Sequence, residues 1–423
     1  MSGATASEPE PTTRHRQLAL LGLLYVAQAL PLGFFVIALP AILRDRGVSL
    51  ERVGLLGALA LPFLLKCLWA PMVDRFGAAT GHYRSWLLPL QLLAVVTVAA
   101  IATLDPRTHF GPLVGLGTVF MLLAATQDVA TDGLAVRVLQ HQDRSLGNGL
   151  QVGGYYLGQI LGGGVVLVLV DRVGWSLAVA TMAVILVLPL PLVAALREPP
   201  AAAPDTRKKV HLGTLLQFCR RDGIGPWMTL LVTWRLGETM VQWMVNPMLV
   251  DRGFSLERIG VLLGVAGSLG SLAGAASAGW IMRRHGRQTT LVTTGLILTA
   301  ALAAHVAPAL GLGGLALIQV VIVGGGIASG AATAAVYTGA MDASHYDTAG
   351  TDFTIQQSLL AAGPMLAAVV SGLSATAFGY AGHFALAALL QLAVVTSLIV
   401  SHTLRGGVES RARLDSGTLV GES

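Results

Sequence analysis

The sequence predicts an all-α membrane protein in which twelve transmembrane helices form two pseudo-symmetric six-helix bundles. Three observations predict this class: an apolar composition, a regular series of apolar runs, and an internal repeat. Hydrophobic residues make up 54% of the 423 residues and charged residues only 12%, and the mean hydropathy is +0.70. A soluble domain carries about 25% charged residues and cannot bury this much apolar surface. The composition therefore excludes a soluble enzyme, a disordered chain and a fibrous protein.

Twelve apolar runs follow one another along the chain, and each is long enough to cross ~30 Å of hydrocarbon as an α-helix. Transmembrane β-strands would be shorter and would alternate apolar with polar residues. The runs are 18–43, 53–73, 86–104, 113–136, 148–170, 174–196, 226–250, 258–281, 288–307, 313–340, 354–376 and 380–402.

The polar stretch 197–225 separates the first six runs from the last six, which predicts a linker between two halves. Lys and Arg are concentrated in the segments on the linker's side of the membrane, so both termini are predicted to be cytoplasmic. The same asymmetry explains the net charge of +5 without a nucleic-acid partner. The predicted organisation is a cytoplasmic N-terminal tail (1–17), an N-terminal six-helix bundle (18–196), a cytoplasmic linker (197–225), a C-terminal six-helix bundle (226–403) and a cytoplasmic C-terminal tail (404–423).

A repeated motif relates the two halves. Arg46–Gly54 reads RGVSLERVG and Arg252–Gly260 reads RGFSLERIG, with seven of nine positions identical. Each copy follows the first apolar run of its half and opens the second. The repeat predicts an internal duplication, and duplicated six-helix units are typical of transporters with a binding site near the bilayer midplane.

Charged side chains inside spanning helices are functional candidates, because each costs at least a few kcal/mol there. Asp128 and Asp132 are four residues apart and share one helix face. Two close carboxylates in a low dielectric favour the retention of a proton on one of them, so both are candidates for proton coupling. For Asp132 an alternative stays open, in which it is solvated near the cytoplasmic end or paired with Arg137.

A second polar stripe runs along the expected seventh helix. Arg235 and Glu238 are three residues apart, and Gln242 and Asn246 follow at one-turn intervals beside Trp243. Glu238 is a candidate proton carrier that depends on Arg235, and the other four residues are candidates for the substrate cavity. A permanent Arg235–Glu238 pair that only fixes helix packing is the alternative, and packing is also the commoner role of a tryptophan.

Four further residues are predicted to line the substrate cavity. Lys66 is a lone cation in the second helix, where it can meet an anionic substrate or neutralise Asp128. Tyr25 and Gln28 lie three residues apart in the first helix, and Gln356 lies in the eleventh. Hydrogen bonds between helices are the alternative role of these last three residues.

The turn between the second and third helices contains a candidate conformational latch, formed by Asp74, Arg75, Gly77 and Arg84. A carboxylate and guanidinium there can pair across the cytoplasmic gap in one conformation and separate in the other. We find no ATPase motif, metal-spaced histidine cluster or Ser/His/Asp arrangement, so we expect no enzyme activity, cofactor, catalytic residue or metal site. The expected partners of the monomer are a small-molecule substrate, protons and membrane lipids.

Several of these motifs resemble one branch of the major facilitator superfamily. Lys66–Arg75 (KCLWAPMVDR), with Gly81–Trp86 (GHYRSW), resembles its helix 2–3 signature, although Tyr83 stands where an arginine is common. Thr126–Ala135 (TQDVATDGLA) resembles its helix 4 motif, and Arg235–Glu238 its helix 7 motif. The branch contains anhydromuropeptide permeases, acetyl-coenzyme A transporters and siderophore permeases of the rhizobactin and pyochelin type.

The resemblance implies the major facilitator fold and a proton-coupled transporter of the bacterial inner membrane that works by alternating access. Gly350–Ser358 (GTDFTIQQS) is similar to the siderophore subgroup, so the expected function is import of a ferric siderophore or similar iron chelate. Two alternatives stay open: an anhydromuropeptide permease, and a membrane sensor or scaffold that transports nothing. The last alternative predicts that Glu238→Gln leaves function intact.

Overall fold

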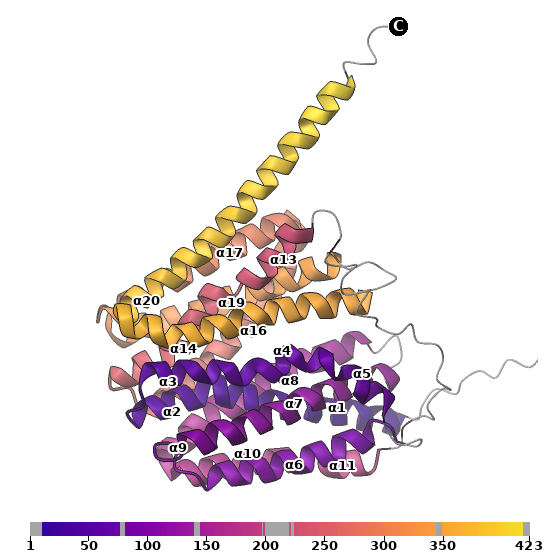
Figure 1. Cartoon of the computed structure of the whole chain (residues 1–423), viewed down its shortest axis with the longest axis vertical. Helices are drawn as coiled ribbons and strands as arrows, with labels where there is room; N and C mark the ends of the chain where they lie inside the picture. The colour runs from indigo at the N-terminus through magenta and orange to yellow at the C-terminus, as the bar shows by residue number, and fades with distance from the viewer. Residues whose placement is uncertain are drawn as a thin grey trace, which may run out of the picture. The chain divides into compact units, whose positions relative to one another are not determined.

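The computed structural model describes residues 11–76, 81–138, 144–196, 198, 220, 224–343 and 349–417. Every regular element in these ranges is a helix (Figure 1). Nine of the described helices are long and apolar enough to cross a membrane. The predicted class of all-α membrane protein is therefore confirmed, whereas the number of twelve spans stays a prediction.

Two of the twelve expected spans are interrupted and two others share one element, and this accounts for the difference. The run 53–73 is divided, where Pro62 and Pro71 each lack a backbone N–H. Its pieces are α3 (Leu50–Leu55), η2 (Leu56–Ala60), α4 (Leu61–Leu65), η3 (Lys66–Leu68) and α5 (Ala70–Arg75). The run 226–250 is divided between α13 (Ile224–Thr233) and α14 (Leu236–Asp251). The last two runs lie in α20 (Ala349–Gly417), which consists of two helices that meet at a kink at non-helical Gly379 (φ 65°).

The other elements follow the predicted runs, with short 3₁₀ or π segments inside several of them. They are α1 (Pro11–Gly33), η1 (Phe34–Ala38), α2 (Leu39–Asp45), α6 (Arg84–Ala102), α7 (Phe110–Val138), α8 (Arg144–Gln159), η5 (Ile160–Val165), α9 (Val166–Val173), α10 (Trp175–Val187), α11 (Leu190–Ala194), α15 (Leu256–Ile259), η6 (Gly260–Gly267), α16 (Ser268–His285), α17 (Arg287–Ala304), α18 (Val306–Ala309) and α19 (Gly314–Asp342).

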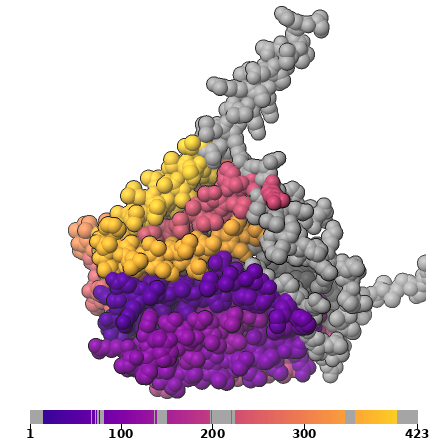
Figure 2. All heavy atoms as spheres, viewed as in Figure 1, coloured from indigo at the N-terminus to yellow at the C-terminus, as the bar shows by residue number. Residues whose placement is uncertain are grey.

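The chain forms two compact units. The first contains Met1–Gly213, Gln242–Leu269 and Ala368–Thr376, and the second contains Thr214–Val241, Gly270–Ala367 and Ala377–Ser423. In the first unit α1 packs against α7 and α8, and α6 packs against α7 and α10. Side chains fill the spaces between these helices on the face drawn in Figure 2. In the second unit α17 packs against α19.

The two copies of the repeated motif adopt the same backbone conformation. Gly47 and Gly253 have φ angles of 80° and 78°, which glycine adopts without steric cost. Ser49 (φ −66°, ψ 153°) and Ser255 (φ −65°, ψ 152°) then begin the next helix. In both copies the residue after the glycine donates to the carbonyl five residues earlier, at 2.9 and 3.1 Å, which is the Schellman closure of a helix. The identical residues of the two copies therefore specify the same turn in both halves of the chain.

Glycines allow α1 and α8 to approach closely. A Cβ added to Gly158 would lie 2.6 Å from Ala29 Cβ and 2.8 Å from Val26 O. Gly153, in the same helix, has nothing within 4 Å of an added Cβ. Small residues at such crossings are typical of helix packing in membranes.

We expect Gly158→Ala to lower the melting temperature in detergent and Gly153→Ala to raise or preserve it. Both substitutions gain helix propensity of about 1 kcal/mol, but only the first forces α1 away, at a cost of about 1–3 kcal/mol. Thermal unfolding of the two purified variants measures the difference. Equal melting temperatures would contradict the close approach of α1 and α8.

Candidate functional site

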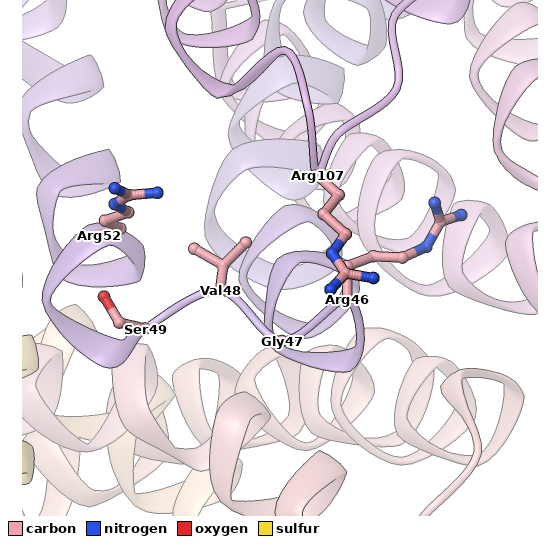
Figure 3. Close-up of a pocket in the computed structure, with 6 residues that line it drawn as sticks. All are labelled: Arg46, Gly47, Val48, Ser49, Arg52 and Arg107. Carbon is pink, nitrogen blue, oxygen red and sulfur yellow. The ribbon is translucent and has the colours of Figure 1, made fainter.

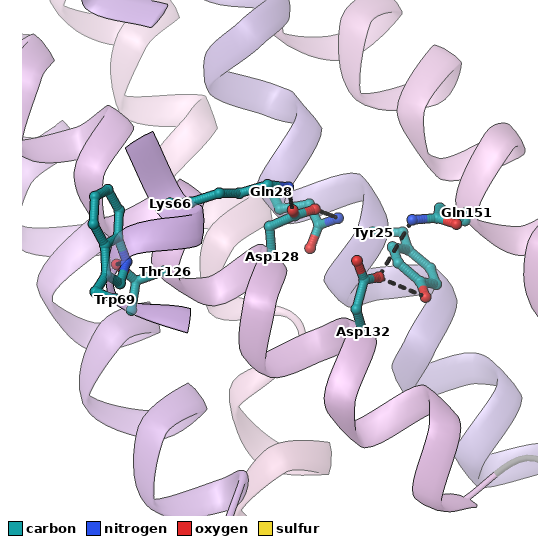
Figure 4. Close-up of polar contacts among 8 residues, drawn as sticks. All are labelled: Tyr25, Gln28, Lys66, Trp69, Thr126, Asp128, Asp132 and Gln151. Atoms are coloured by element: carbon teal, nitrogen blue, oxygen red, sulfur yellow. Dashed lines mark hydrogen bonds and ion pairs between the residues drawn. The ribbon is translucent and has the colours of Figure 1, made fainter. Parts of the chain in front are cut away.

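Three helical segments of the first unit meet at one carboxylate in the membrane-spanning region (Figure 4). The Nζ of Lys66, in η3, donates to Oδ2 of Asp128 in α7, and the Nε2 of Gln28, in α1, donates to Oδ1 at 2.7 Å. The Asp128 side chain is 12% exposed and the Lys66 side chain 33%. The structure thus pairs Lys66 with Asp128, one of the two partners considered for it, and adds Gln28 to the pair.

Asp132 lies one turn further along α7 and has different partners. Its Oδ1 accepts from the hydroxyl of Tyr25 and from Nε2 of Gln151, both at 3.3 Å. The alternative partner Arg137 instead has its Nη1 3.7 Å from a carboxylate oxygen of Glu198. Asp132 is therefore held by neutral donors, whereas Asp128 is held by a cation. Gln151 carries no charge and lies in no motif, so the sequence alone did not indicate it.

Three buried, uncharged polar side chains on α1 and α7, the helices that carry this network, have spare hydrogen-bonding capacity. In the described part of the chain, Gln28 Oε1, Gln127 Nε2 and Thr131 Oγ1 are buried without a hydrogen-bond partner. An unsatisfied buried polar group costs about 1–3 kcal/mol, so these atoms favour a polar ligand or water beside them. Gln127 was not among the sequence candidates, because its neighbour Asp128 carried the stronger signal.

The second unit holds a separate ion pair. Arg235 Nε donates to Oε2 of Glu238 at 3.1 Å, and the hydroxyl of Ser329, in α19, donates to Oε1 of the same carboxylate. The Glu238 side chain is 10% exposed. The predicted i, i+3 pair is thus formed, and its role in proton coupling stays a prediction. Ser329 was missed because a serine in an apolar helix gives no pattern.

The other predicted cavity residues are buried to different degrees. Gln242 is half-buried, and Trp243 and Asn246 are 5% and 2% exposed. Asn246 Oδ1 is buried without a partner in the described structure. Gln356 accepts from Trp227 Nε1 at 2.6 Å and donates to a carbonyl of α19 at 2.9 Å. This geometry fits the alternative role of Gln356, a hydrogen bond between helices.

Most of the predicted latch lies outside the described residues. Asp74 and Arg75 end α5, but their side chains are not described, and Gly77 falls in the undescribed segment 77–80. Arg84 begins α6, and its backbone N–H donates to Glu198 Oε1 at 2.6 Å. The Glu198 side chain is fully buried. The latch therefore stays a prediction, with Glu198 as an additional anchor of this turn.

The departure at Tyr83 has a structural counterpart. The guanidinium of Arg137, from the end of α7, lies 4.6 Å from the centre of the Tyr83 ring, within the range of a cation–π contact. A Cβ at Gly133 would lie 2.4 Å from this ring. Gly133 thus leaves the space that the ring of Tyr83 occupies, and α7 supplies the positive charge there.

The described side chains include no group of three or more His, Cys, Asp or Glu residues that could hold a metal ion. The chemistry of the two clusters is that of carboxylates held by a cation, amides and hydroxyls. Such groups can bind charged or polar solutes and can take up or release protons.

Comparisons with known proteins agree with this description. The chain matches the Major Facilitator Superfamily over residues 21–351. It is 28% identical over 285 residues to the anhydromuropeptide permease of Escherichia coli K12, covering 66% of this chain and 58% of the permease. The chain thus spans less than two thirds of that relative's length. The putative transporter AmpG 4 of Rickettsia felis is 22% identical over 291 residues, which cover 65% of this chain and 69% of that protein.

Solved structures share the fold. The crystal structure of a mutant of the nucleoside transporter NupG superposes with a TM-score of 0.71 at 11% sequence identity. The superposition covers 91% of this chain and 99% of that chain. The predicted major facilitator fold is therefore confirmed.

Proposed function

The chain belongs to the Major Facilitator Superfamily, and from this premise we propose that it is a secondary active importer of an anhydromuropeptide. Protons drive uptake across the bacterial inner membrane by alternating access, with both termini in the cytoplasm. The similarity to an anhydromuropeptide permease supports this substrate above the ferric siderophore expected from the sequence motifs.

The ion pair between Lys66 and Asp128 carries the proposal. When Asp128 takes up a proton, it no longer neutralises Lys66, and a carboxylate of the substrate peptide can take its place. The spare oxygen of Gln28, whose amide holds Asp128, suits a hydroxyl group of a sugar. Substrate and proton then bind together, because an unpaired charge in this environment is costly.

A ferric siderophore is the second candidate substrate. The segment Gly350–Ser358 and the sequence ATDGLA (Ala130–Ala135) in the helix 4 motif favour it, because both are similar to the siderophore subgroup. An anionic iron chelate can also meet Lys66, so the two substrates share one chemistry at that residue. A sensor or scaffold without transport is the third candidate, and only a transport measurement separates it from the others.

We expect the protein to accumulate labelled anhydromuropeptide in cells that lack their own permease, and a protonophore to abolish this accumulation. A proton gradient equivalent to 100 mV supplies ~2.3 kcal/mol per proton, which corresponds to about fiftyfold accumulation. A parallel assay offers a panel of iron-55 siderophores to the same cells. Vector-only cells and immunoblots of membranes provide the controls.

The outcomes of these assays distinguish the candidate functions. Protonophore-sensitive uptake of the muropeptide supports the proposal. Uptake of a siderophore alone would replace the substrate but keep the transport mechanism. No uptake of either compound, with the protein present in the membrane, would contradict both substrates.

A further inference from the structure

The first unit has a pocket of about 390 Å³ whose chemistry differs from that of the central network. It lies at the predicted periplasmic end, where the turn after α2 faces the loop between α6 and α7 (Figure 3). Three of its six lining residues are arginines, namely Arg46, Arg52 and Arg107, and the other three are Gly47, Val48 and Ser49. The six described lining residues therefore include no carboxylate, and we call this site the arginine pocket.

A comparison of the two copies of the repeat shows which arginines accompany the turn itself and which are additional. Arg46 and Arg52 have counterparts in Arg252 and Arg258 of the second copy, which has the same backbone turn. The turn alone therefore explains one pair of arginines in each half. The third arginine has no such counterpart, because the corresponding loop of the second half, residues 310–314, contains no basic residue. Arg107 therefore distinguishes the surroundings of the first copy of the motif from those of the second.

The loop that carries Arg107 is held in place by its neighbours. The carboxylate of Asp105 accepts from the backbone N–H of Arg107 at 2.7 Å. This hydrogen bond, with a smaller contribution from the charge of Arg46, keeps the pKa of Asp105 below its usual range. The guanidinium of Arg52 lies 5.9 Å from the centre of the Phe110 ring. The six lining residues carry three positive charges and no carboxylate, although Asp45, Glu51 and Asp105 adjoin them in the sequence.

Grouped guanidinium groups recognise an oxyanion, and phosphate above all, because their donors match its oxygens. An exposed leucine beside the arginines points to a lipid as the source of that phosphate. Leu55 lies three residues after Arg52, on a shared face, and is 52% exposed. An exposed apolar side chain in a spanning segment suits an acyl chain better than water.

We propose that the arginine pocket binds the phosphate headgroup of an anionic phospholipid, with an acyl chain against Leu55. The site faces the outer leaflet and is separate from the Lys66–Asp128 network. It does not depend on which substrate the protein transports.

The test titrates phosphatidylglycerol into the purified full-length protein in detergent and measures the melting temperature. A ligand that binds only the folded state raises this temperature. Phosphatidylcholine, whose phosphate is neutralised by its own choline cation, is the zwitterionic comparison, and inorganic phosphate at about 10 mM is the soluble comparison. The variants are Arg107→Ala, Arg107→Lys and Arg52→Ala, with Arg258→Ala as the matched control from the second copy.

We expect phosphatidylglycerol to stabilise the native protein more than either comparison does. Its half-saturating concentration should rise about fivefold in Arg107→Ala and in Arg52→Ala, the factor that corresponds to ~1 kcal/mol for each arginine near an anionic lipid surface. Arg107→Lys should lose less, and Arg258→Ala should match the native protein. Because no transport is measured, the result is independent of the proposed function.

Three results would overturn the proposal. One is an equal effect of phosphatidylglycerol and phosphatidylcholine on the native protein. Another is an equal effect of inorganic phosphate, which would assign the pocket to a free anion. The third is an unchanged response in both Arg107→Ala and Arg52→Ala, or an equal loss in Arg258→Ala.

Discussion

Asp128→Asn is expected to abolish gradient-driven accumulation and to lower the stability of the folded protein. The substitution removes the carboxylate that pairs with Lys66 and accepts from Gln28. Removal of one partner from a buried ion pair costs about 3–5 kcal/mol. We expect roughly 3 kcal/mol or less here, because one third of the Lys66 side chain is exposed. Accumulation should fall from about fiftyfold at 100 mV to equilibration.

A double-mutant cycle separates the two effects. Lys66→Met should destabilise the protein as Asp128→Asn does, whereas Lys66→Met/Asp128→Leu should recover stability, because replacing both partners by apolar groups is often neutral. If the pair acts in transport, the double variant stays inactive despite its recovered melting temperature. A stable double variant that still accumulates substrate would assign the pair to structure alone.

The charged residues could be selected from the sequence because their physical signal is strong. An ionised side chain in a spanning helix is costly, so Lys66, Asp128 and Glu238 stood out from apolar surroundings. The i, i+3 spacing then predicted that Arg235 pairs with Glu238, and this ion pair is present in the structure. Long-range pairing was less certain, since Lys66 had two possible partners and only the fold places it against Asp128.

The neutral and boundary residues could not be selected in this way. Ser329 and Gln151 donate to site carboxylates, but an uncharged polar residue in a helix has many roles and gives no periodic signal. Glu198 lay in a predicted linker, where an exposed carboxylate is ordinary, although the structure buries it against the start of α6. Burial of this kind depends on tertiary contacts that a single sequence does not contain.

The fold was predictable to the level of class and repeat, but not to the continuity of each helix. The apolar runs indicate the length of each span, whereas the breaks within a helix depend on local backbone hydrogen bonding. The effect of Pro62 and Pro71 on the second run follows from their missing N–H groups. The break near Arg235 has no proline, so it could not be inferred from composition.

Glu238→Gln is the second variant for which we expect a large effect. It prevents proton exchange at residue 238 with little change in the shape of the side chain. The amide has nearly the shape of the carboxylic acid: its oxygen can accept from Arg235, and its N–H can donate to the hydroxyl oxygen of Ser329. The capacity to exchange a proton and the negative charge beside Arg235 are lost. Accumulation driven by the gradient should therefore disappear, while exchange of labelled for unlabelled substrate across the membrane continues.

Ser329→Ala is the matched control for this variant. It removes one hydrogen bond to the carboxylate, worth about 1.5–3 kcal/mol for a charged group, but it leaves the titratable group and Arg235 in place. Its accumulation should be reduced but still sensitive to a protonophore. Normal protonophore-sensitive accumulation in Glu238→Gln would assign the Arg235–Glu238 pair to helix packing. Loss of both accumulation and exchange would mean that the carboxylate charge itself is needed for substrate binding or for the conformational change.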